Sequence, residues 1–252
     1  MELSFASTLL ITLLFFIVAL LYSSVGHGGA SGYLAVLSFF VVSTAEMSTT
    51  ALILNLVVAG TASVAFLRAK HFSMRLTLPF ILTSIPTAFL GGWINVSHRV
   101  YGILLAMVLL LAASRLMMKL ETVERAAEDY PPPRQSIALP VGGLIGLVSG
   151  IVGVGGGIFL SPLIMLMGWA NAKRTAATSA VFILINSLAG LGGRAVHGSL
   201  GGVDLVTFML AAFVGGILGS RLGALRFSNL LLRRLLAVVL LIAAVKLFVT
   251  SL

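Results

Sequence analysis

Two glycine-rich stretches interrupt strongly apolar sequence, and their backbone could bind an anion. The second runs from Gly150 to Gly157, and the first, a looser copy, runs from Val25 to Gly32. Glycine lowers helix stability, so both stretches predict breaks in membrane helices. A break exposes backbone N–H groups, and the helix that follows points its positive dipole end at them. The glycines predicted to bind are Gly26, Gly28, Gly29, Gly153, Gly155, Gly156 and Gly157.

Close packing of helices is the other use of glycine in a membrane. We favour it for Gly91, Gly92, Gly215 and Gly216. For Gly153 to Gly157, the density of glycine and the short apolar piece that follows favour a site.

Polar side chains recur seven residues apart in two of the apolar runs. Ser48 and Asn55 form one pair, and Ser179 and Asn186, with the neighbouring Thr178, form the other. Seven residues are two helical turns, so each pair lies on one face and can donate hydrogen bonds to a polar substrate. Hydrogen bonding between helices is an equally good interpretation, and the sequence leaves both open.

His27 is a titratable residue inside the first glycine stretch, and we predict it as the candidate for coupling to a proton or cation. Its counterpart in the second stretch is Val154, so such a role would be asymmetric. The sequence has no cysteine, no carboxylate pair for acid–base catalysis and no cluster of metal ligands. We therefore predict no catalytic residue, no metal and no cofactor.

An alternative interpretation of the first glycine stretch is the active site of an intramembrane protease. Gly29-Ala30-Ser31-Gly32 has the GxSG form of rhomboid-type intramembrane serine proteases, with His197 as the partner. The counterpart of Ser31 is Ile158, and the pair would have to bridge two halves of the chain. The duplication described below explains the glycines without catalysis, so we predict that the chain is not an enzyme.

The composition is that of a polytopic membrane protein. Of the 252 residues, 59% are hydrophobic and 9% are charged, and the mean hydropathy is +1.14. A soluble protein needs about 25% charged residues to cover its surface. The net charge of +9 does not indicate a nucleic-acid partner, because Lys and Arg lie in short loops between apolar runs.

Two halves of similar pattern flank one polar stretch. We predict a first transmembrane repeat at 1–118, a cytoplasmic linker at 119–136 and a second transmembrane repeat at 137–252. Each half has about five apolar segments, at 5–24, 33–43, 48–67, 76–94 and 100–118, and at 137–152, 158–169, 175–193, 203–221 and 231–250. Val25-Gly26-x-Gly28-Gly29 matches Val152-Gly153-x-Gly155-Gly156. We infer an internal duplication.

The basic residues predict the orientation. With an odd number of segments in each half, one side of the membrane collects thirteen Lys and Arg residues and the other three. The first side is therefore predicted to be cytoplasmic, with both termini outside. An odd count also inserts the two halves upside down relative to each other, which is typical of secondary transporters.

The apolar pieces after the glycine stretches are short. As a helix, 158–169 would reach ~18 Å, against a hydrocarbon core of ~30 Å. We predict that it pairs with the preceding run as a hairpin whose glycine turn lies at membrane depth. The sequence leaves open ten spans, or fewer spans with two re-entrant hairpins.

The sequence resembles the TauE/SafE family of membrane permeases, described as sulfite exporters or anion permeases. The resemblance rests on Gly153-x-Gly155-Gly156-Gly157 followed by Pro162, and on Ala176-Ala177-Thr178-Ser179 downstream, and it covers essentially the whole chain. It implies a bacterial-type cytoplasmic-membrane protein that moves small sulfur-containing or organic anions, including sulfite and sulfonates. The first half carries a weaker copy, with His27 where the second has Val154.

Together these features predict an all-α membrane protein of two inverted repeats with glycine-broken or re-entrant helices. It is expected to move a small anion across the cytoplasmic membrane by alternating access, with a passive anion channel of the same architecture as the alternative. The expected partners are the anionic substrate and membrane lipid, with proton or cation coupling. The second stretch is expected to be the general anion site, and the first the place of selectivity or coupling.

Overall fold

The part of the chain that can be described is built from α-helices. The computed structural model describes residues 5–40, 42–117, 130–196, 198, 205–225, 241, 244, 245, 248 and 249. These residues contain nine helices and no strand, which confirms the predicted all-α polytopic class. The helices are α1 (Phe5–Ser23), α2 (Ala30–Leu37), α3 (Thr44–Arg68), α4 (Met74–Trp93), α5 (His98–Met117), α6 (Gln135–Val152), α7 (Gly157–Leu166), α8 (Ala172–Val196) and α9 (Leu205–Leu225). The predicted segment at 231–250 and most of the predicted linker lie outside the described residues.

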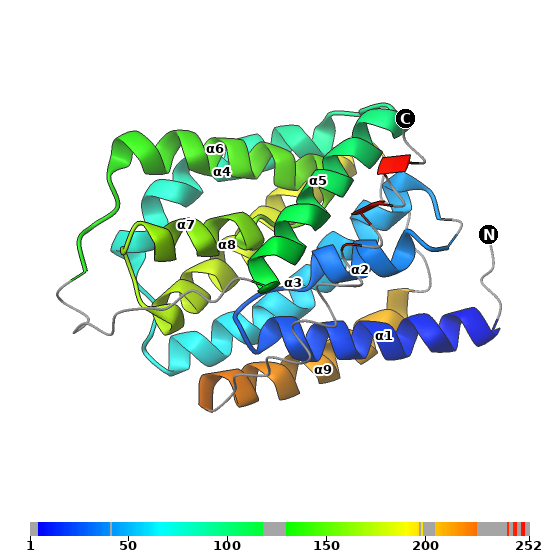
Figure 1. Ribbon diagram of the computed structural model, residues 1–252, viewed down its shortest axis with the longest axis horizontal. Coiled ribbons are helices and arrows are strands. Elements are labelled where there is room, and N and C mark those ends of the chain that lie inside the picture. The colour runs from blue at the N-terminus through cyan, green and yellow to red at the C-terminus, as the bar shows by residue number, and fades with distance from the viewer. Residues whose placement is uncertain are drawn as a thin grey trace.

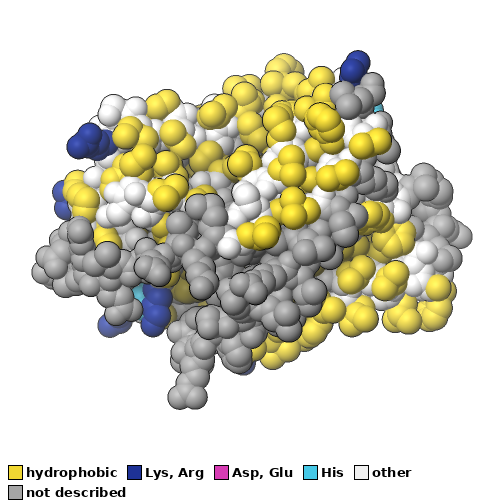
Figure 2. Space-filling model, in the orientation of Figure 1, with side chains coloured by type: hydrophobic (Ala, Val, Ile, Leu, Met, Phe, Trp, Pro, Cys, Tyr) yellow, Lys and Arg dark blue, Asp and Glu magenta, His cyan; other side chains and the backbone are white. Residues whose placement is uncertain are grey.

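Five helices are long and apolar enough to cross a bilayer, namely α1, α3, α4, α6 and α8. Several of them point large apolar side chains outward, and Leu13, Leu82, Leu144 and Leu188 are between 56% and 65% exposed. Figure 2 shows hydrophobic side chains over much of the coloured surface, with Lys and Arg at its margins. Such a surface is solvated by lipid, not by water.

The two longest helices occupy the centre. α3 and α8 have 25 residues each and are the most buried of the five candidate spans. α3 begins at a capping box, in which Ser43 Oγ accepts from Glu46 N and the Glu46 carboxylate accepts from Ser43 N. α8 begins after Asn171, whose Oδ1 accepts from Arg174 N at 3.0 Å. Local caps therefore fix where both central helices start.

The helices of the two halves pack reciprocally. The most extensive contacts join α4 with α6 and α1 with α9, and Figure 1 shows these pairs along opposite edges with α3 and α8 between them. Exchanging α1 for α6, α3 for α8 and α4 for α9 converts one pair into the other. The same exchange converts the contact of α4 with α8 into that of α3 with α9. An internal duplication would produce this reciprocity, and the two repeats and their opposite orientation stay predictions.

Glycines allow the closest of these contacts. A Cβ on Gly91 in α4 would overlap a carbonyl oxygen of α6, and one on Gly215 in α9 would lie 2.5 Å from a carbonyl oxygen of α1. A Cβ on Gly92 would overlap a carbonyl oxygen of α8, and one on Gly216 would lie 3.0 Å from Thr61 Oγ1 of α3. All four therefore serve close helix packing, as predicted.

α2 and α7 are short, and both follow a glycine stretch. With 8 and 10 residues they reach about 12 and 15 Å, about half of the hydrocarbon core or less. Every residue of α2 is buried. The pieces after the glycine stretches are thus too short to span, as predicted.

Candidate anion site at the second glycine break

Two irregular segments separate helices within the core. We call residues 24–29, between α1 and α2, the first break, and residues 153–156, between α6 and α7, the second break. Residues 26–29 and 153–156 are buried. The glycines with φ between 76° and 94° are Gly26, Gly29, Gly153, Gly155 and Gly156. Side chains with a Cβ rarely adopt this region, so the irregular backbone at both breaks depends on glycine.

Each break packs against a long helix of the other half. A Cβ on Gly26 would overlap the Ala176 carbonyl of α8, and one on Gly153 would lie 2.7 Å from the Ser48 carbonyl of α3. Ser48 therefore faces the second break as Ala176 faces the first. The sequence matches Ser48 with Ser179. The residue of α8 that contacts the first break is instead Ala176, three residues before Ser179.

Asn55 joins the two breaks. Its Oδ1 accepts from Ala30 N at 3.2 Å, at the start of α2, and its Nδ2 donates to Val154 O at 3.1 Å, in the second break. A backbone N–H must donate and a carbonyl must accept, so these partners fix the orientation of the amide. Both side-chain polar atoms of Asn55 are thereby used, and the interpretation as a bond between helices holds for this residue.

Ile183 takes the equivalent place on α8, seven residues after Ala176. Its side chain would overlap a Cβ on Gly157 and would lie 2.8 Å from one on Gly155. Gly28 of the first break lies against both Asn55 and Ile183. Of the predicted glycines, Gly28, Gly155 and Gly157 are therefore brought together around these two side chains.

Three buried polar side chains near the second break lack a hydrogen-bond partner among the described residues. They are Ser149, Asn186 and Ser187, all fully buried. Ser187 Oγ lies 3.0 Å from the place of a Cβ on Gly155, and Ser149 Oγ lies 3.5 Å from that of a Cβ on Gly156. Asn186 is next to Ser187 on α8, and neither polar atom of its amide is bonded. The unbonded hydroxyls of Ser149 and Ser187 thus lie beside the glycines at the start of α7. The unbonded amide of Asn186 belongs to the residue before Ser187 on α8.

The first turns of the two short helices differ in their hydrogen bonding. Ala30 N, in the first turn of α2, is bonded by Asn55. The N-cap of α7 is Gly156, which, like Gly29 before α2, has no side chain to cap the helix. The positive end of α7 therefore meets Ser149 and Ser187, which are free to donate to an anion.

Arg194 supplies a buried positive charge at the other end of the second break. Its NH2 donates to Gly150 O at 3.1 Å and to Ile151 O at 2.8 Å, and 7% of the residue is exposed. Although Arg194 is in the last turn of α8, it is not solvated, because the last carbonyls of α6 bind it inside the protein. Its charge offsets the negative dipole end of α6 at the break. Arg68, the matching residue of the first half, is exposed.

His27 connects the first break to α7 and α8. Its Nδ1 lies 3.0 Å from Val25 O and its Nε2 lies 3.1 Å from Ser161 Oγ, which in turn lies 2.7 Å from Ser179 Oγ. The carbonyl can only accept, so Nδ1 carries a proton and Nε2 of the neutral ring accepts from Ser161. Ser161 Oγ also lies 3.0 Å from Gly157 O, a second acceptor for its proton.

The remaining predicted hydroxyls bond within the protein. Ser48 Oγ donates to Thr44 O of its own helix at 2.8 Å, and Thr178 Oγ1 accepts from Thr77 Oγ1 of α4 at 3.3 Å. Ser179 is bonded to Ser161. Of the predicted Ser, Thr and Asn residues, Asn186 is therefore the one with its polar atoms unbonded within the described structure.

Sequence reasoning did not single out Ser149, Ser161 or Ser187 as site residues. Each has a neighbour that it did single out, because Ser149 precedes the second glycine stretch, Ser161 precedes Pro162 and Ser187 follows Asn186. A lone serine in an apolar run is common in membrane helices, so only the contacts distinguish these three.

A many-helix membrane protein with paired helix breaks at its centre has the architecture of a transporter. The chain belongs to the TauE/SafE family, since the family described as "Sulfite exporter TauE/SafE" matches residues 11–247. The relatives described below are named as transporters, which supports the prediction that this chain is a transporter and not an enzyme.

Two named relatives illustrate the similarity. The chain is 36% identical over 235 residues to the "Probable membrane transporter protein y4hK" of Sinorhizobium fredii, and the match covers 92% of this chain and 95% of the relative. It is 32% identical over 209 residues to the "Probable membrane transporter protein MamO" of Paramagnetospirillum magneticum, covering 67% of this chain and 33% of that longer protein. No solved structure matches the chain significantly.

Proposed function

We propose that this protein is a secondary transporter that binds a small anion, such as sulfite, a sulfonate or a related organic anion, at the second break. One observation carries the proposal: two buried hydroxyls, on Ser149 and Ser187, are unbonded beside the glycines at the start of α7, and the amide of Asn186, next to Ser187 on α8, is unbonded too. A buried polar group without a partner costs about 1–3 kcal/mol. A bound oxyanion would satisfy these groups, and the helix end and Arg194 would stabilise its charge.

The transport mechanism that we propose is alternating access between two inverted repeats in the cytoplasmic membrane. The reciprocal packing of the halves and the crossed contacts of the two breaks support it. The positive-inside count supports an orientation with the linker in the cytoplasm and both termini outside. The alternative is a passive anion channel of the same architecture.

A pair of serine variants tests the site. Ser187→Ala removes an unbonded hydroxyl at the break, so we expect the Tm in detergent to change by less than about 2 °C. Sulfite uptake into proteoliposomes should fall roughly tenfold, because one hydrogen bond to a charged ligand is lost. Ser63→Ala is the matched control, since Ser63 is also buried and unbonded in the described structure but lies about 12 Å along α3 from Asn55.

Two outcomes of this test are informative. Equal uptake by the wild type, Ser187→Ala and Ser63→Ala would reject the second break as the site.

A thermal-shift screen of the wild type against sulfite, sulfate, sulfonates and small carboxylates first selects the anion for the uptake assay. If none of them shifts the Tm, the class of substrate proposed here is wrong.

We further propose that His27 couples transport to protons. When neutral, His27 accepts from Ser161; when protonated, it can donate to Ser161 Oγ, whose own proton then goes to Gly157 O. A proton can thus be accepted with the same neighbours bonded. We expect an inward proton gradient to drive uphill uptake by the wild type and not by His27→Gln. Uphill uptake of equal size by both would remove His27 from the mechanism, and downhill flux alone would favour a channel.

A further inference from the structure

α4 carries a buried polar side chain, Ser84, that the site described above does not include. Ser84 is fully buried, and its hydroxyl has no hydrogen-bond partner within the described structure. Nearby hydroxyls of the same helix are bonded, since Thr83 donates to Leu139 O of α6 at 2.7 Å and Thr87 donates to Thr83 O at 2.9 Å. Burial of an unbonded hydroxyl costs free energy, which a ligand that bonds to Ser84 would offset.

Contacts with α6 show on which side of α4 this residue lies. A Cβ on Gly146 would lie 2.7 Å from Ser84 Cα, and one turn further along both helices a Cβ on Gly150 would overlap the Ala88 carbonyl. α4 and α6 therefore run in the same direction, with Ser84 and Gly146 at the same depth. Ser149 follows Gly146 by three residues, so its unbonded hydroxyl lies within about one helical turn of Ser84 in depth.

α8 runs in the same direction as α4 on another side of it. Thr77 Oγ1 of α4 donates to Thr178 Oγ1 of α8 at 3.3 Å, and further along both helices a Cβ on Gly92 would overlap a carbonyl oxygen of α8. Ser84 is seven residues after Thr77, and Asn186 is eight residues after Thr178. These separations correspond to about 10.5 and 12 Å along the two helices, so Ser84 and Asn186 lie at similar depth.

Asn186 lies on the face of α8 that is turned towards α4 and α6. One turn before it, Phe182 belongs to the same apolar cluster as Phe80 of α4 and Ile145 of α6. One turn after it, a Cβ on Gly190 would lie 3.5 Å from the backbone of α6. Residues four apart share a helix face, so the amide of Asn186 points to the place where the three helices meet.

Ser84, Ser149 and Asn186 thus form a three-helix cluster, with one residue each from α4, α6 and α8. All three are fully buried, and none of their side-chain polar atoms is bonded to another atom within the described structure. Hydroxyl and amide groups that served only to join these helices would bond to one another. Unbonded donors from three sides instead suit a ligand that accepts hydrogen bonds from all of them.

We propose that Ser84 is a further binding residue for the transported anion, which is then held by α4 as well as by α6 and α8. This inference rests on the proposed function, because Ser149 and Asn186 belong to both. A hydroxyl can donate to an oxygen of an oxyanion, and bonds to a charged acceptor are stronger than neutral ones. α4 belongs to the predicted first repeat, and α6 and α8 belong to the second. An anion bound to all three would therefore favour the arrangement in which the repeats are closed around it.

Alanine at this position tests the contact. Ser84→Ala removes an unbonded hydroxyl, so the Tm in detergent without ligand should not fall. We expect the apparent Kd for sulfite, measured from the rise of Tm with sulfite concentration, to increase roughly tenfold. Ser63→Ala is the control, since Ser63 is buried and unbonded within the described structure, and it should keep the Kd of the wild type.

The same titration separates this inference from the proposed function. If Ser187→Ala weakens sulfite binding and Ser84→Ala does not, the inference is overturned and the second break stays the site. If neither variant weakens binding, both are rejected. A fall in Tm of Ser84→Ala without ligand would show that the hydroxyl is bonded within the protein, which also overturns the inference.

A cysteine at position 84 tests whether anions reach α4. The sequence has no cysteine, so Ser84→Cys carries the only thiol. We expect sulfonatoethyl methanethiosulfonate, a thiol reagent that carries a sulfonate, to modify this variant in proteoliposomes, and ethanesulfonate to slow the reaction. Ser63→Cys should show no such protection. Absence of modification of Ser84→Cys, or a rate that ethanesulfonate leaves unchanged, would exclude an anion from the three-helix cluster.

Discussion

Asn55 and Asn186 show that one residue type can serve two purposes in the same core. Both are fully buried on a central helix, yet Asn55 bonds two backbone groups and Asn186 none within the described structure. Leaving a buried N–H and a buried carbonyl unpaired costs about 1–3 kcal/mol each. The first residue therefore stabilises the fold, whereas the second has donors that we propose bind the substrate.

Replacing each asparagine by alanine should separate these roles. We expect Asn55→Ala to lower the Tm in detergent by roughly 5–15 °C, because Ala30 N and Val154 O lose their partner. Asn186→Ala should change the Tm far less while reducing anion uptake. Differential scanning fluorimetry and uptake on the same preparations provide the comparison. Equal losses of Tm in the two variants would show that Asn186 also has a structural bond.

The two asparagines could not be told apart from the sequence. Each stands seven residues after a serine in an apolar helix, and this spacing suggested that they were counterparts. Their partners come from other parts of the chain, and Asn55 meets Val154 across 99 residues. Local pattern carries no information about such partners, so the glycine breaks were predictable but the bonded state of the polar side chains was not.

At the scale of elements, the second break is a junction between the end of α6 and the start of α7. The last carbonyls of α6 are bonded from other helices, because Arg194 of α8 binds Gly150 O and Ile151 O and Tyr101 of α5 binds Val152 O. The breaks and short helices were predicted because glycine density is visible in the sequence. The burial of Arg194 was not, since it depends on carbonyls more than forty residues away.

Removing this charge should loosen the junction. We expect Arg194→Met to lower the Tm by several degrees, because two buried carbonyls lose charge-assisted bonds worth about 1.5–3 kcal/mol each, partly offset by the smaller desolvation cost of Met. Arg68→Met is the matched control, since Arg68 ends α3 and is exposed. A fall in Tm of the same size in both variants would contradict the assignment of Arg194 to the end of α6.

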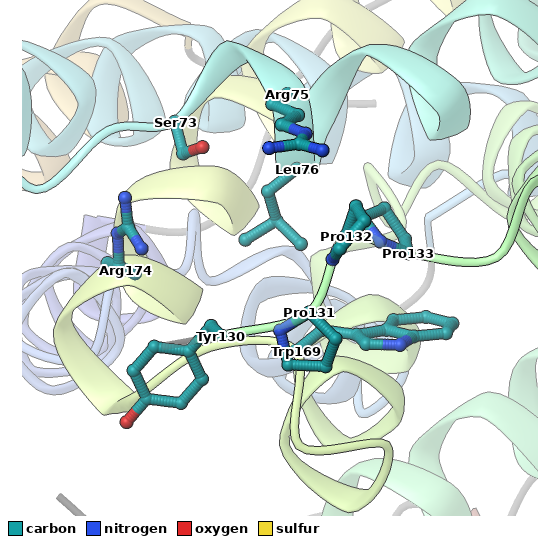
Figure 3. Close-up of a pocket in the computed structure, with 9 residues that line it drawn as sticks. All are labelled: Ser73, Arg75, Leu76, Tyr130, Pro131, Pro132, Pro133, Trp169 and Arg174. Carbon is teal, nitrogen blue, oxygen red and sulfur yellow. The ribbon is translucent and has the colours of Figure 1, made fainter. Parts of the chain in front are cut away.

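At the scale of the whole molecule, segments predicted to lie on the same side of the membrane meet. The loop before α4, the segment before α6 and the start of α8 all carry basic residues counted as cytoplasmic, and all three line one cavity, shown in Figure 3 with Arg75 and Arg174. Figure 2 shows Lys and Arg mainly towards one end of the molecule. This arrangement supports the predicted orientation.

The absence of cysteine from the sequence makes the orientation easy to measure. We expect a membrane-impermeant maleimide to label Ser97→Cys in intact cells and Ser136→Cys only after permeabilisation. Both serines are exposed, one between α4 and α5 and the other in the first turn of α6. The reverse pattern of labelling would show that the termini face the cytoplasm, and labelling of both in intact cells would reject the topology.

The bonds of Asn55 also bear on how the two halves can move. Asn55 belongs to α3, and its side-chain amide is bonded both to Ala30 N of α2 in its own half and to Val154 O in the other half. If one half rocks against the other, the two hydrogen bonds of Asn55 must either break or lie near the axis of rotation, where displacement is smallest. Because the second break lies at the same point, an anion bound there would stay nearly still while the protein turns around it. Asn55 would then act as the fulcrum of the transport cycle.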